Sequence, residues 1–199
     1  MFKKSLVLSG ALVFATAGLA NDIESYLGIG GGVDWSRFKE NVTYTAPGIY
    51  KSSSITETKS AFSMKLTGGA IVDQNHRLSL SYIPVFKSYY NIHNFLGAYD
   101  YLYSLDGDKK IYGGIHLGFA NFKGKKDASV YGDKTAFAYG LQGGLIYELD
   151  RNLELDFGLM YTKHDAKLKY QETVGAGVDN STVKLEHSLS ALVGINYKF

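Results

Sequence analysis

Hydrophobic residues recur at every second position along eight segments of the chain, and this alternation limits the possible folds more than any other feature. Successive side chains of a β-strand point to opposite faces, so a period of two predicts strands that each have one apolar face. Helical spacing of apolar residues is hard to find after residue 21. The segments are 27–35, 62–72, 77–86, 95–103, 111–119, 137–148, 153–162 and 183–199.

Short and long connections alternate between these segments. The short ones contain Asp, Asn and Gly, which favour tight turns because they tolerate a left-handed backbone or bond their own main chain. They lie at 73–76, 106–110 and 150–152. The long ones are polar, and we expect loops at 39–60, 87–94, 121–134 and 163–182. An antiparallel up-and-down sheet then has a turn end and a loop end.

The two faces of the predicted strands differ in composition. One face is a band of Leu, Ile, Val, Tyr and Phe, in which His187 is the one ionisable side chain other than tyrosine. The other face combines Gly, Ala and Ser with the charged residues. A lysine or arginine that faces lipid at the bilayer midplane costs about 2 to 4 kcal/mol, so a band without such charges is typical of contact with lipid. A soluble barrel would direct its charged residues outward.

A sheet that lies in lipid must close, because an open edge would leave backbone N–H and C=O groups unpaired. Eight strands form a barrel that its own side chains can fill. Aromatic residues at the ends of the band predict two interfacial girdles. They are Trp35, Phe86, Phe119, Phe137 and Tyr161 at the loop end, and Tyr26, Tyr103, Tyr147, Tyr197 and Phe199 at the turn end. The predicted fold is all-β, an eight-stranded antiparallel up-and-down transmembrane β-barrel.

The first twenty residues have the pattern of a secretory signal peptide. Lys3 and Lys4 precede an apolar run at 6–14, which is too short to span a bilayer, and small residues follow up to Ala20. The predicted division is therefore a signal peptide at 1–20 and a barrel domain at 21–199. Removing two lysines from the 21 basic residues leaves 19, equal to the 19 acidic residues. This balance argues against nucleic acid as a partner.

The signal peptide, the hairpin YELDRNLELDFGLMY (147–161) and the ending LVGINYKF (192–199) carry a resemblance to a known family. The chain resembles the small outer-membrane β-barrels of Gram-negative bacteria, which include opacity-type adhesins and the OmpA and OmpX barrels. The resemblance implies an outer-membrane location with periplasmic termini. It also implies that the barrel assembly machinery recognises the last strand, through Val193, Ile195, Tyr197 and Phe199.

Charged residues on the inner face predict a cluster in the lumen, where charges are tolerated only when they are paired. We expect one layer near the turn end, a second layer above it that also holds His116, and a third layer higher still. The layers comprise Arg77, Glu148, Glu154 and Lys198, then Asp100 and Asp156, then Asp34 and Lys65. Two interpretations stay open: a plug that closes the barrel, and a gate or narrow pore.

Enzymatic function is not expected. Outer-membrane deacylases carry a His-x-Ser pair, and none of the five histidines here has a serine two residues later. The histidines are scattered and cysteine is absent, so no zinc-ligand spacing exists. We therefore predict no catalytic, cofactor-binding or metal-binding residues, and a lipid-modifying enzyme remains the weaker alternative.

The polar loops hold the remaining candidate contacts. Lys123, Lys125 and Lys126 form a basic cluster that could meet anionic lipopolysaccharide or host polysaccharide, although a solvated loop explains it equally well. Tyr44, Tyr50, Tyr131 and Tyr170 could anchor protein contacts or pack loop against loop. The predicted function is a monomeric surface protein with a structural or adhesive role, whose partners are outer-membrane lipid, the assembly machinery and host surface molecules. A narrow channel for small solutes is the alternative.

Overall fold

The computed structural model describes residues 23–47, 49–87, 90–105, 107–124, 134–174 and 177–199. The predicted signal peptide lies outside the described residues. Within them, no helix is long and apolar enough to cross a membrane, a criterion that does not address strands.

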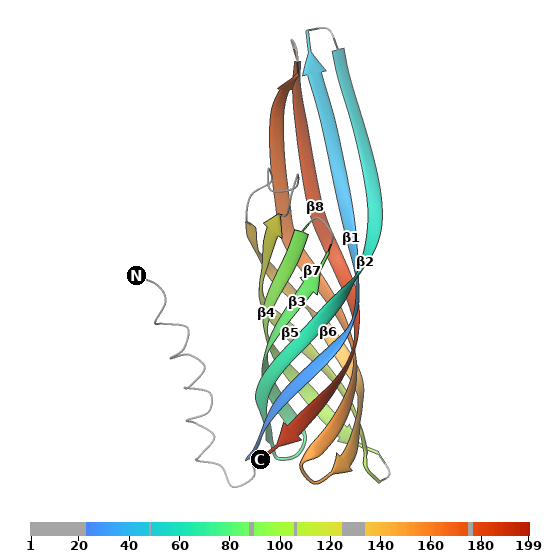
Figure 1. Cartoon of the computed structure of the whole chain (residues 1–199), viewed down its shortest axis with the longest axis vertical. Coiled ribbons are helices and arrows are strands. Elements are labelled where there is room, and N and C mark those ends of the chain that lie inside the picture. Colours follow the sequence, from blue (N-terminus) through green and yellow to red (C-terminus); the bar gives the residue numbers. More distant parts are fainter. Residues whose placement is uncertain (1–22, 48, 88–89, 106, 125–133, 175–176) are drawn as a thin grey trace, which may run out of the picture.

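Eight antiparallel strands form one closed barrel in which each strand pairs with its neighbours in the sequence and β8 pairs with β1 (Figure 1). This confirms the predicted fold class. The strands are β1 (Ile23–Ala46), β2 (Ile49–Val72), β3 (His76–Phe86), β4 (Tyr90–Ser104), β5 (Lys109–Gly124), β6 (Lys134–Asp150), β7 (Leu153–Val174) and β8 (Gly177–Lys198).

The strand register sets the tilt of the barrel wall. Partners followed once around the barrel from Tyr26 lead back to Ser36 on the same strand, a shift of ten residues. With eight strands at ordinary spacing, this shift corresponds to a strand tilt of about 40°. Residues that are equally far from their turns therefore lie at different heights in the lumen.

Four strands continue well beyond the rest of the barrel. β1 and β2 have 24 residues each and β7 and β8 have 22 each, whereas β3 to β6 have 11 to 17. β2 pairs with β3 only from Phe62 onward, and β7 pairs with β6 only as far as His164. Above these points the order β2-β1-β8-β7 forms a four-stranded sheet that rises from the loop end (Figure 1).

The predicted loops at 39–60 and 163–182 are therefore wrong for most of their length. These stretches are strands, and the paired backbone continues to Ala46 and Ile49 in one hairpin. β4 likewise begins at Tyr90, inside the loop predicted at 87–94, and β5 continues to Gly124. The prediction relied on an apolar face, but a hairpin in water needs only paired backbone and Ser- and Thr-rich side chains that suit a strand.

Side chains alternate across the barrel wall as predicted. The outward face is a band of exposed Leu, Ile, Val, Phe and Tyr, and the inward face is largely buried. Tyr26 is an exception to the predicted turn-end girdle, because it is 2% exposed and lies inside the barrel. Its even number places it on the face of Gly28 and Gly30, so strict alternation already required this position.

A β-bulge changes the faces of β8 near the loop end. Arg37 pairs with His187 and Phe38 pairs with Leu185, so Glu186 is an extra residue in β8. Leu185 consequently turns inward and is 4% exposed, instead of facing outward as the alternation predicted. The bulge thus ends the simple alternation of β8 at the rim of the barrel.

The outer face carries more histidine than the sequence suggested. His76 and His93 lie at the ends of β3 and β4, just outside the predicted segments, and both are register partners of outward residues. His76 Nδ1 is 2.8 Å from the Tyr99 hydroxyl, and His93 Nδ1 is 2.7 Å from the Tyr82 hydroxyl. Each of these rim histidines therefore shares a hydrogen bond with a tyrosine.

Candidate functional site

The lumen is the first candidate site, and small residues on its wall make room for its larger side chains. Tyr112 projects inward from β5 and is 8% exposed. A Cβ atom on Gly144 would lie 2.8 Å from its ring, and a Cβ atom on Gly158 would lie 2.7 Å from its hydroxyl oxygen. These two glycines therefore allow the Tyr112 ring to lie across β6 and β7.

Arg77 is the centre of a buried ionic network in the lumen. Its Nε atom donates to Asp100 Oδ2 at 2.9 Å, and its Nη1 atom donates to Asp156 Oδ2 at 3.1 Å. Its guanidinium carbon lies 4.1 Å from the centroid of the Tyr112 ring. Arg77 is 2% exposed and Asp100 is fully buried. β3, β4, β5 and β7 are therefore joined across the lumen by one cation.

The two carboxylates of this network have further donors. Tyr112 donates its hydroxyl hydrogen to Asp156 Oδ1 at 2.9 Å, and Gln142 Nε2 donates to Asp100 Oδ1 at 2.7 Å. Charge-assisted hydrogen bonds of this kind are stronger than neutral ones. Arg77 and the two carboxylates have a formal charge of −1, which the neutral donors help to stabilise and which Lys65, beside Asp156, can balance.

A second ionic network lies at the turn end. Lys198 Nζ is 3.0 Å from Glu154 Oε1 and 3.2 Å from Glu148 Oε1, and Lys110 Nζ is 2.8 Å from the same Glu148 oxygen. Glu154 is 2% exposed, whereas the side chains of Lys110 and Glu148 are 18% and 27% exposed. This network therefore forms a partly solvated rim below the Arg77 network.

Asp34 forms a third polar group, toward the loop end. Its carboxylate accepts hydrogen bonds from Ser36 and, at 2.9 Å, from Ser190. Lys87 Nζ lies 3.5 Å from Asp34 and donates to the Lys59 carbonyl oxygen at 2.8 Å. Lys87 thus links the end of β3 to a backbone group on the edge that β2 exposes above the barrel.

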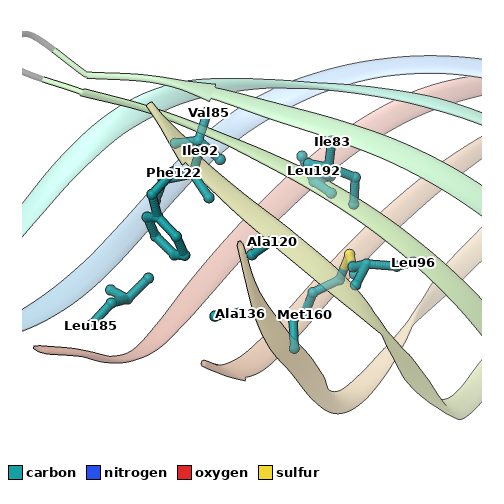
Figure 2. Packing of buried hydrophobic residues seen from close by; sticks show 11 residues of the cluster. Ile83, Val85, Ile92, Leu96, Ala120, Phe122, Ala136, Met160, Leu185 and Leu192 are labelled. Atoms are coloured by element: carbon teal, nitrogen blue, oxygen red, sulfur yellow. The ribbon is translucent and has the colours of Figure 1, made fainter. Parts of the chain in front are cut away.

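The loop-end half of the lumen also contains an apolar cluster. On β3, β4, β5 and β7, the buried apolar residues lie on the loop side of the residues of the Arg77 network. Their side chains come from strands β3 to β8 and point toward one another (Figure 2). Phe38 and Ala61 pack against them. The cluster comprises Ile83, Val85, Ile92, Leu96, Ala120, Phe122, Ala136, Ala138, Met160, Leu185 and Leu192.

Two histidines lie inside the lumen. His116 Nε2 is 3.0 Å from the Thr162 hydroxyl, and His164 Nε2 is 3.2 Å from the Ser188 hydroxyl. The Nδ1 atoms of both rings are buried without a hydrogen-bond partner. Neither histidine is hydrogen-bonded to a carboxylate, so the His164–Ser188 pair lacks the third group that orients a catalytic base.

Lys65 lines a small cavity with Gln142, Asp156 and Asn196. The cavity has a volume of about 20 Å³, which is enough for roughly one water molecule. Among the described residues, no group of three or more His, Asp or Glu side chains could hold a metal ion.

The structure groups the predicted lumen charges differently from the expected layers. Arg77 lies with Asp100 and Asp156 and not with Glu148, Glu154 and Lys198, and Lys65 shares its cavity with Asp156 and not with Asp34. Sequence reasoning missed Tyr112 and Gln142, although the alternation places both on the inner face. It also missed Lys87, which lies in a stretch that was predicted to be a loop.

The candidate loop contacts are partly described. Tyr44 lies in β1 and is half-buried, Tyr50 lies in β2 and is 72% exposed, and Lys123 is exposed near the end of β5. Tyr170 belongs to β7, but its side chain lies outside the described part of the structure. Lys125, Lys126 and Tyr131 lie outside the described residues.

The last strand closes the barrel. Val193, Ile195, Tyr197 and Phe199 all point outward with exposures between 46% and 60%. The Phe199 backbone N–H donates to the Ser25 carbonyl oxygen at 3.0 Å. The final residue is therefore tied to the beginning of β1, and its aromatic row stays exposed on the outer face.

Solved structures share this architecture. Neisserial surface protein A superposes with a TM-score of 0.59 and 16% identity, over 88% of this chain and 97% of that one. The outer membrane protein OprG from Pseudomonas aeruginosa superposes with a TM-score of 0.60 and 14% identity, over 88% of this chain and 96% of that one. The chain has the fold of these small outer-membrane β-barrels. No protein-family model and no curated protein matches the sequence. At these identities the likeness concerns the fold alone.

Proposed function

We propose that this protein is an integral outer-membrane β-barrel with a closed lumen and a non-catalytic role at the cell surface. Its exposed apolar band supports a membrane location, because contiguous apolar patches of this extent are rare on soluble proteins. The aromatic rims of the band fit the two membrane interfaces. The turn end, with both ends of the barrel domain, then faces the periplasm, and the four-stranded sheet faces outward.

The observation that carries the closed lumen is the Arg77 network. Arg77 reaches from β3 to a carboxylate on β7, which lies across the barrel, and both ion pairs are buried. The apolar cluster fills the lumen on the loop side of this network. A polar solute would have to break the ion pairs and then displace packed apolar side chains, and both steps are unfavourable.

The surface role is supported by the four-stranded sheet. Residues 50–60 of β2 are all exposed, and Tyr50 is the most exposed large hydrophobic side chain among the described residues. Exposed tyrosines are frequent anchors of protein interfaces. We infer that host or neighbouring surface molecules bind this sheet, while outer-membrane lipid surrounds the band and the assembly machinery recognises Val193, Ile195, Tyr197 and Phe199.

Two measurements test this function. Purified protein in planar lipid bilayers should produce no reproducible conductance steps, and steps on the nanosiemens scale would overturn the closed lumen. Replacing 41–54 and 169–182, which lie above the barrel, by short turns should abolish binding to host cells without affecting barrel assembly. Unchanged binding by this correctly assembled variant would contradict a surface role for the hairpins.

A further inference from the structure

A row of basic residues crosses three strands at the loop end of the outer face. Arg37 on β1 pairs with His187 on β8, and His187 pairs with Lys163 on β7. Register partners share a face of the sheet, and neighbouring strands lie about 4.8 Å apart. The three residues therefore span about 10 Å along the barrel surface.

The outward row just below this one belongs to the loop-end girdle. Trp35 pairs with Leu189, and Leu189 pairs with Tyr161. The Tyr161 and His187 rings have centroids 5.4 Å apart. The basic row therefore lies directly above aromatic and apolar side chains that face the membrane interface.

The bulge at Glu186 adds a second basic row on the same face. Beyond the bulge, Lys39 pairs with Lys184, and Lys184 pairs with Lys167 on β7. β1 is regular here, so Lys39 lies on the same face as Arg37, and Lys184 shares that face because β8 has changed its alternation. We call Arg37, Lys39, Lys163, Lys184 and His187 the basic rows.

Two acidic residues accompany the basic rows. Glu186 Oε2 lies 3.5 Å from Arg37 Nε, a partly exposed ion pair that contributes little stability. Asp165 is exposed at the matching irregularity of β7. Arg37, Lys39, Lys163 and Lys184 outnumber these two carboxylates, so the basic rows keep a net positive charge.

On β5 and β6 the outward row directly above the girdle is neutral, and the row beyond it holds a single lysine on β5, Lys123. Phe119 and Phe137 form the girdle on β5 and β6, and the next outward row holds Asn121 and Thr135, which bond each other at 2.9 Å. A ring of cations around the rim would have indicated general solubility. The concentration of charge on β7, β8 and β1 instead indicates a specific site.

We propose that the basic rows bind the phosphate groups of a phosphorylated glycolipid of the lipopolysaccharide class, whose acyl chains lie against Trp35, Leu189 and Tyr161. The proposal rests on the outer-membrane location proposed above. Guanidinium groups bind phosphate in a bidentate manner, and basic clusters next to a membrane bind anionic head groups. A soluble anion could satisfy the cations, but it would leave the apolar row below them unused.

Binding of lipopolysaccharide to the purified barrel in zwitterionic micelles tests this site. The test variant R37Q/K163Q/K184Q removes three charges from the basic rows, and the control variant K51Q/K59Q/K134Q removes three exposed charges elsewhere above the barrel. We expect the apparent Kd to rise about tenfold or more in the test variant and to stay within about twofold of the wild type in the control. Equal weakening in both variants would overturn the site in favour of nonspecific attraction.

A single substitution that is expected to strengthen binding keeps the test independent of folding defects. Glu186→Gln removes the carboxylate that competes for Arg37, so the apparent Kd should fall by about two- to threefold. An unchanged or higher Kd would count against a role for Arg37 in binding.

Two altered ligands show whether the bound phosphate belongs to a lipid or to a soluble saccharide. Dephosphorylated lipopolysaccharide should lose binding, and the soluble phosphorylated core saccharide without acyl chains should compete only weakly. Equal competition by the soluble saccharide would overturn the lipid assignment.

Insertion into phosphatidylcholine vesicles, measured as resistance to carbonate extraction, separates this proposal from the proposed location. Wild-type protein that fails to insert would contradict the membrane location itself. Inserted protein whose lipopolysaccharide binding is the same in the test variant would overturn the basic rows alone.

Discussion

The two halves of the lumen combine ion pairs and apolar packing in different proportions. The turn-end half is held by ion pairs around Arg77 and Lys198 and by a smaller apolar cluster that includes Ile71. The loop-end half contains the larger apolar cluster, with Ile92 and Phe122, together with the Asp34 group. An ion pair depends on each partner, because a lone buried charge is unfavourable, whereas an apolar contact loses only the atoms that are removed. Replacing one charged partner in the turn-end half should therefore reduce stability more than truncating one apolar side chain in the loop-end half.

The largest expected effect is at Arg77. Arg77→Met leaves two buried carboxylates without their cation, and the free energy of unfolding should fall by about 3 to 5 kcal/mol. Urea unfolding of the barrel in phosphatidylcholine vesicles measures this change. The triple variant R77M/D100N/D156N should recover most of the loss, and a loss below about 1 kcal/mol in Arg77→Met would contradict the pairing.

The larger apolar cluster should respond less strongly. Ile92 is 1% exposed, and Ile92→Ala should reduce the free energy of unfolding by about 2 to 4 kcal/mol through lost packing. Ile55→Ala is the matched control, because Ile55 is 53% exposed on the protruding part of β2. If the two substitutions had equal effects in the same urea titration, the apolar cluster would not be packed.

A smaller effect is expected at Tyr112, whose hydroxyl adds one hydrogen bond to the Arg77 network. Tyr112→Phe keeps the ring under Arg77 but removes the donor to Asp156, and should cost about 1 to 2 kcal/mol. Tyr103→Phe, at a position that is 58% exposed, should change stability little. Thermal unfolding in the same vesicles compares the two variants, and matching curves would argue against the Tyr112–Asp156 bond.

The smallest effect is expected at the rim. The side chain of Lys110 is 18% exposed, so Lys110→Gln should cost at most about 1 kcal/mol, and less at high salt. Lys198→Gln should cost more, because the Lys198 side chain is only 8% exposed and contacts the buried Glu154. Urea titrations at low and high salt separate the two, and the reverse order would contradict the proposed difference between rim and interior.

The sequence predicted the strands and the barrel, but not which charges meet. Alternation is a local property, so the apolar band, the closed sheet and the tight turns could be read from it. The meeting of Arg77 with Asp156 depends on the ten-residue shift around the barrel, which is set by cross-strand pairing. The bulge at Glu186 could not be predicted from the residues around it, because an extra residue in β8 is defined only by the pairing of β8 with β1.

The pairing of β1 with both β2 and β8 links the lengths of the two protruding hairpins. β1 pairs with β2 as far as Ala46 and with β8 as far as Thr45, so neither hairpin stands alone. A residue inserted into β1 would shift its partners on both sides and exchange inner and outer faces beyond that point. Sequence change at the tips can thus occur freely by substitution, whereas change in hairpin length requires coordinated insertions in neighbouring strands.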